Sequence, residues 1–254
     1  MNTSENDYGQ LMAAAHKGKQ PKPTIDSELT LSDAYQIQIQ MIELLDSPIV
    51  GYKSALSSLP AQAAFGVAEP LLGVLLENSA VQDGFDLAEM VVPMIEVEMG
   101  YELGLDVTSA VTTDDFVAIF TAMHIAVDLA EVGYTAKPRA VDLVSGNSAA
   151  GRFIKGPAIG SAVDSVGPNR VQVKLLKDDE QVNEATSGDI GDQQTLAIWL
   201  VNKALSLGYP VKKGMLVMTG SLGNILPAQA GQYTACYESE GQILAELVVH
   251  FTKG

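Results

Sequence analysis

The sequence is poor in cysteine and in basic residues, and both shortages narrow what the protein can be. Cys236 is the one cysteine among 254 residues, which excludes an intrachain disulfide and a cysteine-rich zinc site. Fifteen Lys and Arg against 31 Asp and Glu give a formal net charge of −16. Nucleic acids and anionic membrane surfaces are bound chiefly by cationic surface, so neither is an expected partner.

Long apolar runs are also missing, and no leader segment is expected. No run reaches the roughly 20 apolar residues that a bilayer-spanning helix needs. The polar start MNTSENDYGQ lacks the basic and apolar regions of a signal peptide, so a cytoplasmic protein is expected. With 47% apolar and 18% charged residues, the composition is that of a globular chain, long enough to fold without disulfides.

The first 69 residues are predicted to form a small N-terminal helical region. A helix is expected over residues 1–20, where the prolines of QPKP end it. A second helix starts near Ser32, because Thr30 and Asp33 supply capping side chains. A short strand over 49–53 and a loop of small residues over 54–60 follow.

Residues 70–254 are predicted to form a β-rich core, which makes the fold class α+β. Short apolar segments separated by Gly, Pro, Asn and Asp are typical of strands. Helical spacing of apolar residues predicts two helices among them, over 114–126 and 193–207. The expected strands are LLGVLLEN (71–78), EMVVPMIEVEMGYELG (89–104), AVDLVSGN (140–147), RVQVKLLKD (170–178), GMLVMTGSLG (214–223) and ILAELVVHF (243–251).

Carboxylates at strand spacing give the first candidate site. In PMIEVEMGYE (93–102), Glu96 and Glu98 share one face of a strand with Cα atoms ~6.6 Å apart, close enough to bind one ion. An all-oxygen site suits Mg²⁺ or Mn²⁺. Asp128 lies between apolar residues, and a buried carboxylate needs a partner or a metal. The alternative for Glu96 and Glu98 is a strand whose glutamates face solvent. The alternative for Asp128 is an exposed acid at the end of a helix.

A lysine and three loops give further candidates. Lys53 ends a strand and can hold a carboxylate or titrate, and the amides of residues 54–58 can bind an anion. The alternative is a surface lysine beside a turn. The glycine-containing segments 146–152 and 218–221 are either places of close backbone approach or ordinary turns. Phosphate-loop, dinucleotide-binding, serine-hydrolase and HExxH motifs are absent, and Cys236 has no basic neighbour that would activate it.

Six segments occur in a characteristic order: LTLSDAYQIQ, VGYKSALSS, FGVAEPLLGVLLEN, MIEVEMGYELG, VSGNSAAGRFIKG and IWLVNKALSLGYPVKKGMLVMTGSL. In this order they resemble the 2-keto-4-pentenoate hydratase / 4-oxalocrotonate decarboxylase family of the fumarylacetoacetate hydrolase superfamily. The resemblance covers most of the chain. It implies a small helical N-terminal part and a core built as a mixed β-sheet roll or barrel.

The resemblance also implies roles for individual residues. Glu96 and Glu98 would be two ligands of Mg²⁺ or Mn²⁺, and Asp128 falls where the family has a glutamate at the end of the intervening helix. Lys53 would be the active-site lysine. The substrate would be a small unsaturated 2-oxo acid, and its pocket would be lined by Leu56, Ser58, Asn147 and Thr219. The family further implies a homo-oligomer, a pentamer or decamer, with a sister subunit as a possible partner.

Several positions depart from the family pattern. Asp128 is one methylene shorter than the family's glutamate. Acidic and hydroxyl side chains are replaced by Ala68, Leu71, Gly146, Ala149 and Ala150, and a glycine by Ala55. A drier pocket favours proton transfer or decarboxylation over water delivery. Three hypotheses follow: a metal-dependent lyase or isomerase, a hydratase whose water is positioned by other groups, and a diverged subunit that supports a sister enzyme.

Overall fold

The N-terminal helices form as their capping residues indicate. In the computed structural model, which describes residues 5–25, 28–159 and 167–254, α1 spans Glu5–Lys17 and α2 spans Leu31–Leu45. The Thr30 hydroxyl accepts from the Asp33 amide at 3.2 Å, and the Thr30 amide donates to the Asp33 carboxylate at 2.8 Å. This capping box fixes the start of α2. Both predicted helices are confirmed, although residues 1–4 lie outside the described ranges.

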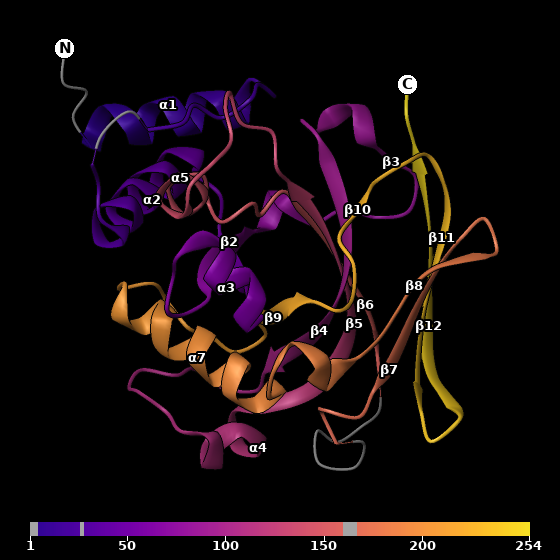
Figure 1. Cartoon of the computed structure of the whole chain (residues 1–254). Coiled ribbons are helices and arrows are strands. Elements are labelled where there is room, and N and C mark those ends of the chain that lie inside the picture. Colours follow the sequence, from indigo (N-terminus) through magenta and orange to yellow (C-terminus); the bar gives the residue numbers. More distant parts are fainter. Residues whose placement is uncertain (1–4, 26–27, 160–166) are drawn as a thin grey trace.

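A seven-stranded sheet carries the centre of the molecule (Figure 1). Its strands run in the order β2 (Leu71–Leu76), β1 (Ile49–Ala55), β9 (Leu216–Ser221), β4 (Pro93–Leu103), β5 (Phe120–Glu131) and β6 (Arg152–Ala158), and β10 (Leu226–Pro227) also pairs with β4. Only the β1–β9 pair is parallel among the pairings described in this sheet. On β4, Ile95, Val97, Met99 and Tyr101 are buried in the main core, which places Glu96 and Glu98 on the opposite face.

A five-stranded sheet lies at one side of the first sheet (Figure 1). Its order is β3 (Phe85–Asp86), β12 (Gln242–Thr252), β11 (Gly231–Ser239), β7 (Gln172–Lys177) and β8 (Glu180–Thr186). The two sheets meet where the Tyr237 hydroxyl of β11 donates to the Glu98 main-chain carbonyl at 2.6 Å. Among the described residues neither sheet closes into a barrel, and the fold is mixed α+β as predicted.

Helices cover the rest of the first sheet. α7 (Gln193–Ser206) packs against β9, β1 and β2, α3 (Leu59–Phe65) follows β1 in the chain, and α5 (Ala140–Ser145) packs with α1 and α2 (Figure 1). α7 starts where the Asp192 carboxylate accepts from the Thr195 amide at 2.8 Å, and it ends before Gly208, whose φ is +79°. The predicted helix at 193–207 is confirmed. Short 3₁₀ turns complete the chain: η1 (Glu77–Ser79), η2 (Leu87–Glu89), η3 (Thr113–Asp115) and η4 (Ser187–Ile190).

The helix predicted over 114–126 is wrong. Only α4 (Phe116–Ile119) is helical there, and β5 begins at Phe120. From Met123 to Glu131 every residue of β5 is buried, so the strand shows no alternation of apolar and polar residues. A fully buried strand and a buried helix both read as an apolar run, and periodicity alone does not separate them.

Two shorter expectations also fail. The segment 140–147 was expected as a strand, but α5 forms because the Asp142 carboxylate accepts from the Arg139 amide at 2.7 Å and caps the helix. The loop expected over 54–60 contains the start of α3, whose N-cap is Ser58. The domain division at residue 69 stays a prediction, since β1 precedes it and yet pairs with β2 and β9 of the core sheet.

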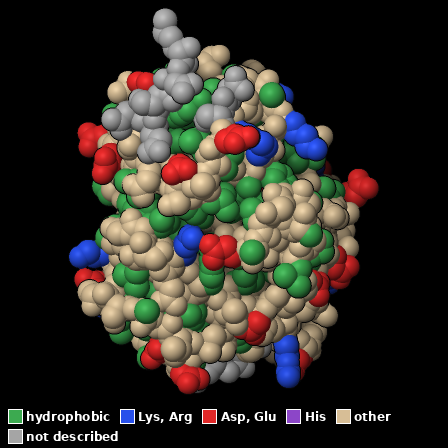
Figure 2. Space-filling model, turned by 60° about the vertical axis from the view of Figure 1, so that its left-hand side comes forward, with side chains coloured by type: hydrophobic (Ala, Val, Ile, Leu, Met, Phe, Trp, Pro, Cys, Tyr) green, Lys and Arg blue, Asp and Glu red, His purple; other side chains and the backbone are tan. Residues whose placement is uncertain are grey.

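The surface reflects the excess of acidic residues. On the face shown in Figure 2, acidic side chains occur over much of the surface, and lysines and arginines lie among them. Within the ranges that the structure describes, no helix is both long and apolar enough to cross a membrane.

Candidate active site

Three buried carboxylates meet where β4 pairs with β5. Glu96 lies directly opposite Asp128 in the antiparallel register, and Glu98 lies two residues further along β4 on the same face. One carboxylate oxygen from each residue lies within 4.8 Å of the others. Glu98 and Asp128 are 0% exposed and Glu96 is 6% exposed. The strand β5, where a helix was expected, is what brings Asp128 to this position.

Lys53 joins this cluster from β1. Its ammonium group is buried and donates a hydrogen bond to Asp128 Oδ2. Parallel pairing with β9 sets its position, because Lys53 lies opposite Met218. When all four side chains are ionised, three carboxylates and one ammonium leave an excess of two negative charges. A buried excess of this size requires compensation, which either protonation of carboxylates or one divalent cation would supply.

The ionisation of the cluster reflects its burial. Desolvation raises the pKa of Glu96 to about 7 and that of Glu98 well above its usual range, and the nearby Asp128 carboxylate adds to both effects while Lys53 opposes them. Desolvation also raises the pKa of Asp128. For Lys53, burial lowers the pKa, but the three carboxylates together raise it above its ordinary value. The lysine is therefore a cation in this environment.

Within the described chain, two carboxylate oxygens of the cluster are buried without a hydrogen-bond partner. Glu98 Oε2 accepts from the Gly220 amide at 2.7 Å, whereas Glu98 Oε1 and Asp128 Oδ1 are buried and have no hydrogen-bond partner among the described residues. Buried polar atoms without a partner are rare because they are unfavourable. A hard divalent cation prefers carboxylate oxygens. These residues therefore fit a Mg²⁺ or Mn²⁺ ion.

A cavity of about 410 Å³ opens onto Lys53 and Glu96. Leu56 and Ser58 line it, as expected for residues that contact a substrate. Leu56 has a φ of +55°, a left-handed conformation that is strained for leucine. Ser58 is held as the N-cap of α3.

Asn147 and Thr219 do not line this cavity within the described part of the chain. The Asn147 side chain accepts from the Val74 amide at 2.7 Å and donates to the Val74 carbonyl at 2.9 Å, so it anchors the loop after α5 to β2. The Thr219 hydroxyl donates to Gln193 Oε1 at 2.6 Å. Both residues hold the walls of the cavity in place, and their contact with substrate stays a prediction.

Two serines on the cavity wall lie in the segments 146–152 and 218–221 that the sequence singled out, although neither serine was assigned a role. Ser221 lies opposite Glu98 in the register of β9 and β4, and its hydroxyl is buried with no partner among the described residues. Ser148 and Ala149 lie in a run of three left-handed residues that begins at Asn147. The sequence signal for Ser221 was its position at the predicted end of a strand, next to the glycine turn that follows.

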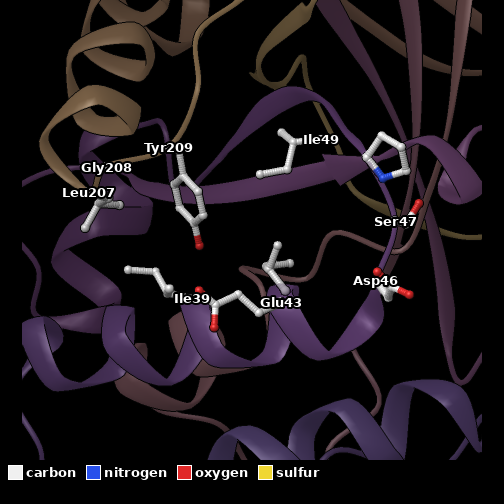
Figure 3. A pocket seen from close by; sticks show the side chains of 10 residues that line it. Ile39, Glu43, Asp46, Ser47, Ile49, Leu207, Gly208 and Tyr209 are labelled. Atoms are coloured by element: carbon white, nitrogen blue, oxygen red, sulfur yellow. The ribbon is translucent and has the colours of Figure 1, made fainter.

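Two other features carry no comparable chemistry. A second cavity of about 500 Å³ lies between the end of α2 and the segment after α7, lined by side chains such as Ile39, Glu43 and Tyr209 (Figure 3). The cluster of three potential metal ligands is not there. Burial raises the pKa of the Cys236 thiol to about 11, so the reactive thiolate is scarce at neutral pH.

Known proteins are similar to this chain in sequence and in fold. No protein-family model matches the chain. A 2-hydroxyhexa-2,4-dienoate hydratase of Comamonas testosteroni is 24% identical over 239 residues, which cover 89% of this chain and 90% of that protein. The 4-oxalocrotonate decarboxylase of Pseudomonas putida G7, complexed with magnesium and adipate, superposes with a TM-score of 0.87 at 23% identity and covers 97% of both chains. This likeness shows the fold.

A closer sequence relative decides the family. The 2-keto-4-pentenoate hydratase 1 of Dechloromonas aromatica (strain RCB) is 30% identical over 192 residues, which cover 72% of this chain and 71% of that protein. The resemblance seen in the six sequence segments is thereby confirmed. The chain belongs to the 2-keto-4-pentenoate hydratase family.

Proposed function

We propose that the chain is a divalent-metal-dependent lyase that acts on an unsaturated 2-oxo acid, in its 2-hydroxydienoic form. The observation that carries this proposal is the buried cluster of Glu96, Glu98 and Asp128 beside Lys53, with two carboxylate oxygens that lack partners. The curated relatives are hydratases of such acids. The cluster forms one wall of a cavity that can hold a small acid.

Glu96, Glu98 and Asp128 are the proposed ligands of the metal. When bound, Mg²⁺ or Mn²⁺ supplies Lewis acidity that stabilises negative charge on the 2-oxo oxygen and the neighbouring carboxylate of the substrate. The Gly220 amide holds Glu98 Oε2 at 2.7 Å and thereby orients the other oxygen of the same carboxylate. The ligand set is thus fixed by three strands and is preorganised before substrate arrives.

Lys53 is the proposed proton donor. Lys53 donates a hydrogen bond to Asp128 and lies beside the three carboxylates, so we propose that it enters the reaction as an ammonium group. An ammonium group can deliver a proton to the dienol carbon and can stabilise the developing enolate. Leu56 and Ser58 are proposed to contact the substrate, and Asn147 and Thr219 to position the loop and strand end beside it.

The test is an assay of the purified chain with 2-hydroxypenta-2,4-dienoate and, separately, with a 2-oxo-enedioate, each with and without Mg²⁺ or Mn²⁺. Loss of dienol absorbance is followed, and products are identified by mass. A gain of one water means hydration, a loss of carbon dioxide from an oxo-enedioate means decarboxylation, and an unchanged mass means isomerisation. Lys53→Met should reduce turnover by about 10²-fold or more, although its three carboxylates should still bind Mg²⁺. Failure of the chain to bind any divalent ion would overturn the proposal.

A second candidate is a diverged subunit that supports a sister enzyme. Leu71 stands where the family has an acid, and it is 1% exposed within the apolar core. Ala149 lines the cavity where the family has a serine. Copurification with a family member and inactivity of the pure chain would support this candidate, and robust activity of the pure chain would exclude it.

We also propose a cytoplasmic location and a homo-oligomeric state. The family resemblance supports a pentamer or decamer, and the net charge of −16 supports high solubility. Light scattering of the purified chain measures the oligomeric mass directly. A monomer at micromolar concentration would contradict the proposal.

A further inference from the structure

The peptide bond between Thr219 and Gly220 lies at a place where strand pairing does not hold it. On one side, β9 pairs with β1 as far as Met218. On the other side, the register with β4 shifts beyond Met218, so Thr219 and Gly220 form a bulge in β9. Gly220 has a φ of +111°, a conformation that favours glycine. Because a bulge disrupts the ladder of hydrogen bonds, other contacts must set the orientation of this peptide.

Side chains bind this peptide at both of its ends. Its carbonyl group accepts from the Ser57 hydroxyl at 2.9 Å, and its N–H group, on Gly220, donates to Glu98 Oε2 at 2.7 Å. Glu98 is one of the three carboxylates proposed to bind the metal. Its other oxygen is buried without a partner among the described residues. The orientation of the peptide therefore sets the direction in which this free oxygen points.

A third contact holds the Thr219 side chain. Its hydroxyl lies 2.6 Å from Gln193 Oε1 and 3.4 Å from the Met99 carbonyl, so its single proton goes to the nearer acceptor. Gln193 Oε1 also accepts from the Tyr101 hydroxyl at 3.2 Å, and Gln193 Nε2 donates to the Ser187 carbonyl at 2.6 Å. Because a carbonyl group can only accept, the Ser187 carbonyl fixes which end of the amide faces Thr219.

Gln193 is itself held firmly in place. It is the first residue of α7 and is 0% exposed. Its backbone amide donates to Asn169 Oδ1 at 2.8 Å. Ser187, which accepts from its side chain, begins η4, and Ile190 at the other end of η4 lines the cavity. Gln193 therefore connects a wall of the cavity to the strand end that holds Glu98.

We infer that Gln193 is a positioning residue that sets the orientation of the metal ligand Glu98 through the bulge at Thr219. This inference rests on the proposed function, because it takes Glu98 as a ligand. Without the Gln193 side chain, the Thr219 hydroxyl turns to the Met99 carbonyl, and the Gly220 N–H group no longer points at Glu98 Oε2. Loss of a residue that orients a metal ligand typically weakens metal binding by about 10–100-fold.

The test compares Gln193→Leu with Gln38→Leu by calorimetric titration of Mg²⁺ into each metal-free protein. Gln38 of α2 is a matched control, because it is also 0% exposed, accepts from the Tyr209 hydroxyl at 3.2 Å and donates to the Leu72 carbonyl at 2.8 Å. Both variants should lose stability toward urea by similar amounts, since each leaves buried polar groups unpaired. Of the two, Gln193→Leu alone should weaken Mg²⁺ binding, by about 10-fold or more.

Thr219→Val supplies a second test, because it removes the hydroxyl and leaves the size of the side chain almost unchanged. It should weaken Mg²⁺ binding to the same degree as Gln193→Leu. The double variant should bind Mg²⁺ no more weakly than either single variant, since both substitutions remove one contact. An unchanged Mg²⁺ affinity in Thr219→Val overturns the inference, even if Gln193→Leu does not fold.

The outcomes separate the two proposals. A loss of Mg²⁺ affinity that is as large in Gln38→Leu as in Gln193→Leu means that Gln193 acts only through general stability. That result overturns the inference and leaves the proposed function standing. Failure of the original chain to bind Mg²⁺ overturns the proposed function and this inference with it.

Discussion

At the scale of single residues, Glu98 has two carboxylate oxygens in different surroundings. One accepts from the Gly220 amide, and the other is buried without a partner. We expect Glu98→Gln to have opposite effects with and without metal. The glutamine side chain carries no charge, so the variant loses one of three negative charges buried together. Without metal, it should therefore be at least as stable as the original chain. It also removes a ligand charge, so Mg²⁺ affinity should fall by about 10²-fold or more.

Thermal unfolding of both proteins with and without Mg²⁺ measures this difference. Saturating Mg²⁺ at 100 times its dissociation constant should stabilise the original chain by about 3 kcal/mol. Glu98→Gln should show little of this gain at the same Mg²⁺ concentration. An equal gain in both proteins would mean that Glu98 is not a ligand.

His16 gives a pH prediction away from the metal site. Burial, followed by the charge of Lys22, lowers the pKa of His16 to about 4, from an ordinary value near 6.5. The unfolded chain therefore binds a proton between pH 6.5 and 4 that the folded chain does not bind. Stability from neutral His16 is complete above pH 6.5 and is lost as the pH falls toward 4.

Replacement of His16 by Gln should flatten this dependence. The difference in unfolding free energy between the two proteins should change by up to about 3 kcal/mol between pH 6.5 and 4, with the original chain losing stability faster. Urea unfolding at several pH values measures it, and the carboxylates common to both proteins cancel in the difference. Parallel curves would show that His16 titrates normally.

At the scale of elements, a buried ion pair attaches the segment after α1 to the end of β5. Lys22 Nζ lies 2.9 Å from Glu131 Oε2, and the lysine is 1% exposed. Lys22→Met leaves the Glu131 carboxylate buried without its cation, which should reduce the unfolding free energy by about 3–5 kcal/mol. Lys19 offers a matched control, since its pair with Glu89 is half exposed at 3.5 Å. Lys19→Met should change stability by less than about 1 kcal/mol in the same urea titration.

The elements also show what could be predicted from the sequence. β4 was predicted because its glutamates alternate with apolar residues, and α2 because Thr30 and Asp33 form a capping box. Both faces of β5 are buried, and Phe116, Phe120 and Met123 fit a helical spacing as well as a strand. Burial of both faces does not by itself prevent a prediction, since the fully buried β2 was predicted as a strand; β5 was missed because the spacing of its apolar residues also fits a helix.

The site residues come together through strand pairing, which cannot be read from the local sequence pattern. The antiparallel register puts Asp128 beside Glu96, and the parallel β1–β9 pair brings Lys53 to both. The family resemblance assigned these residues one by one, including Asp128, although it placed Asp128 at a helix end. The segment 218–221 was a candidate, but Ser221 was assigned no role because its position opposite Glu98 appears only in the register of β9 and β4.

At the scale of the whole molecule, the net charge of −16 acts on the two ligands of the site with opposite sign. A negative protein attracts a divalent cation and repels an anionic acid, and salt screens both effects, with a Debye length of ~30 Å at 0.01 M and ~3 Å at 1 M. Raising the ionic strength should therefore weaken Mg²⁺ binding while it strengthens binding of the 2-oxo acid 2-oxohexanoate at saturating Mg²⁺. Calorimetric titrations across this range of ionic strength measure both dissociation constants.

Tetramethylammonium chloride is the appropriate salt, because its cation is too large to compete with Mg²⁺ among the three carboxylates. A change in Mg²⁺ affinity then reports screening alone. If both affinities fell together, the long-range field would not govern ligand approach, and the acidic surface would serve solubility only.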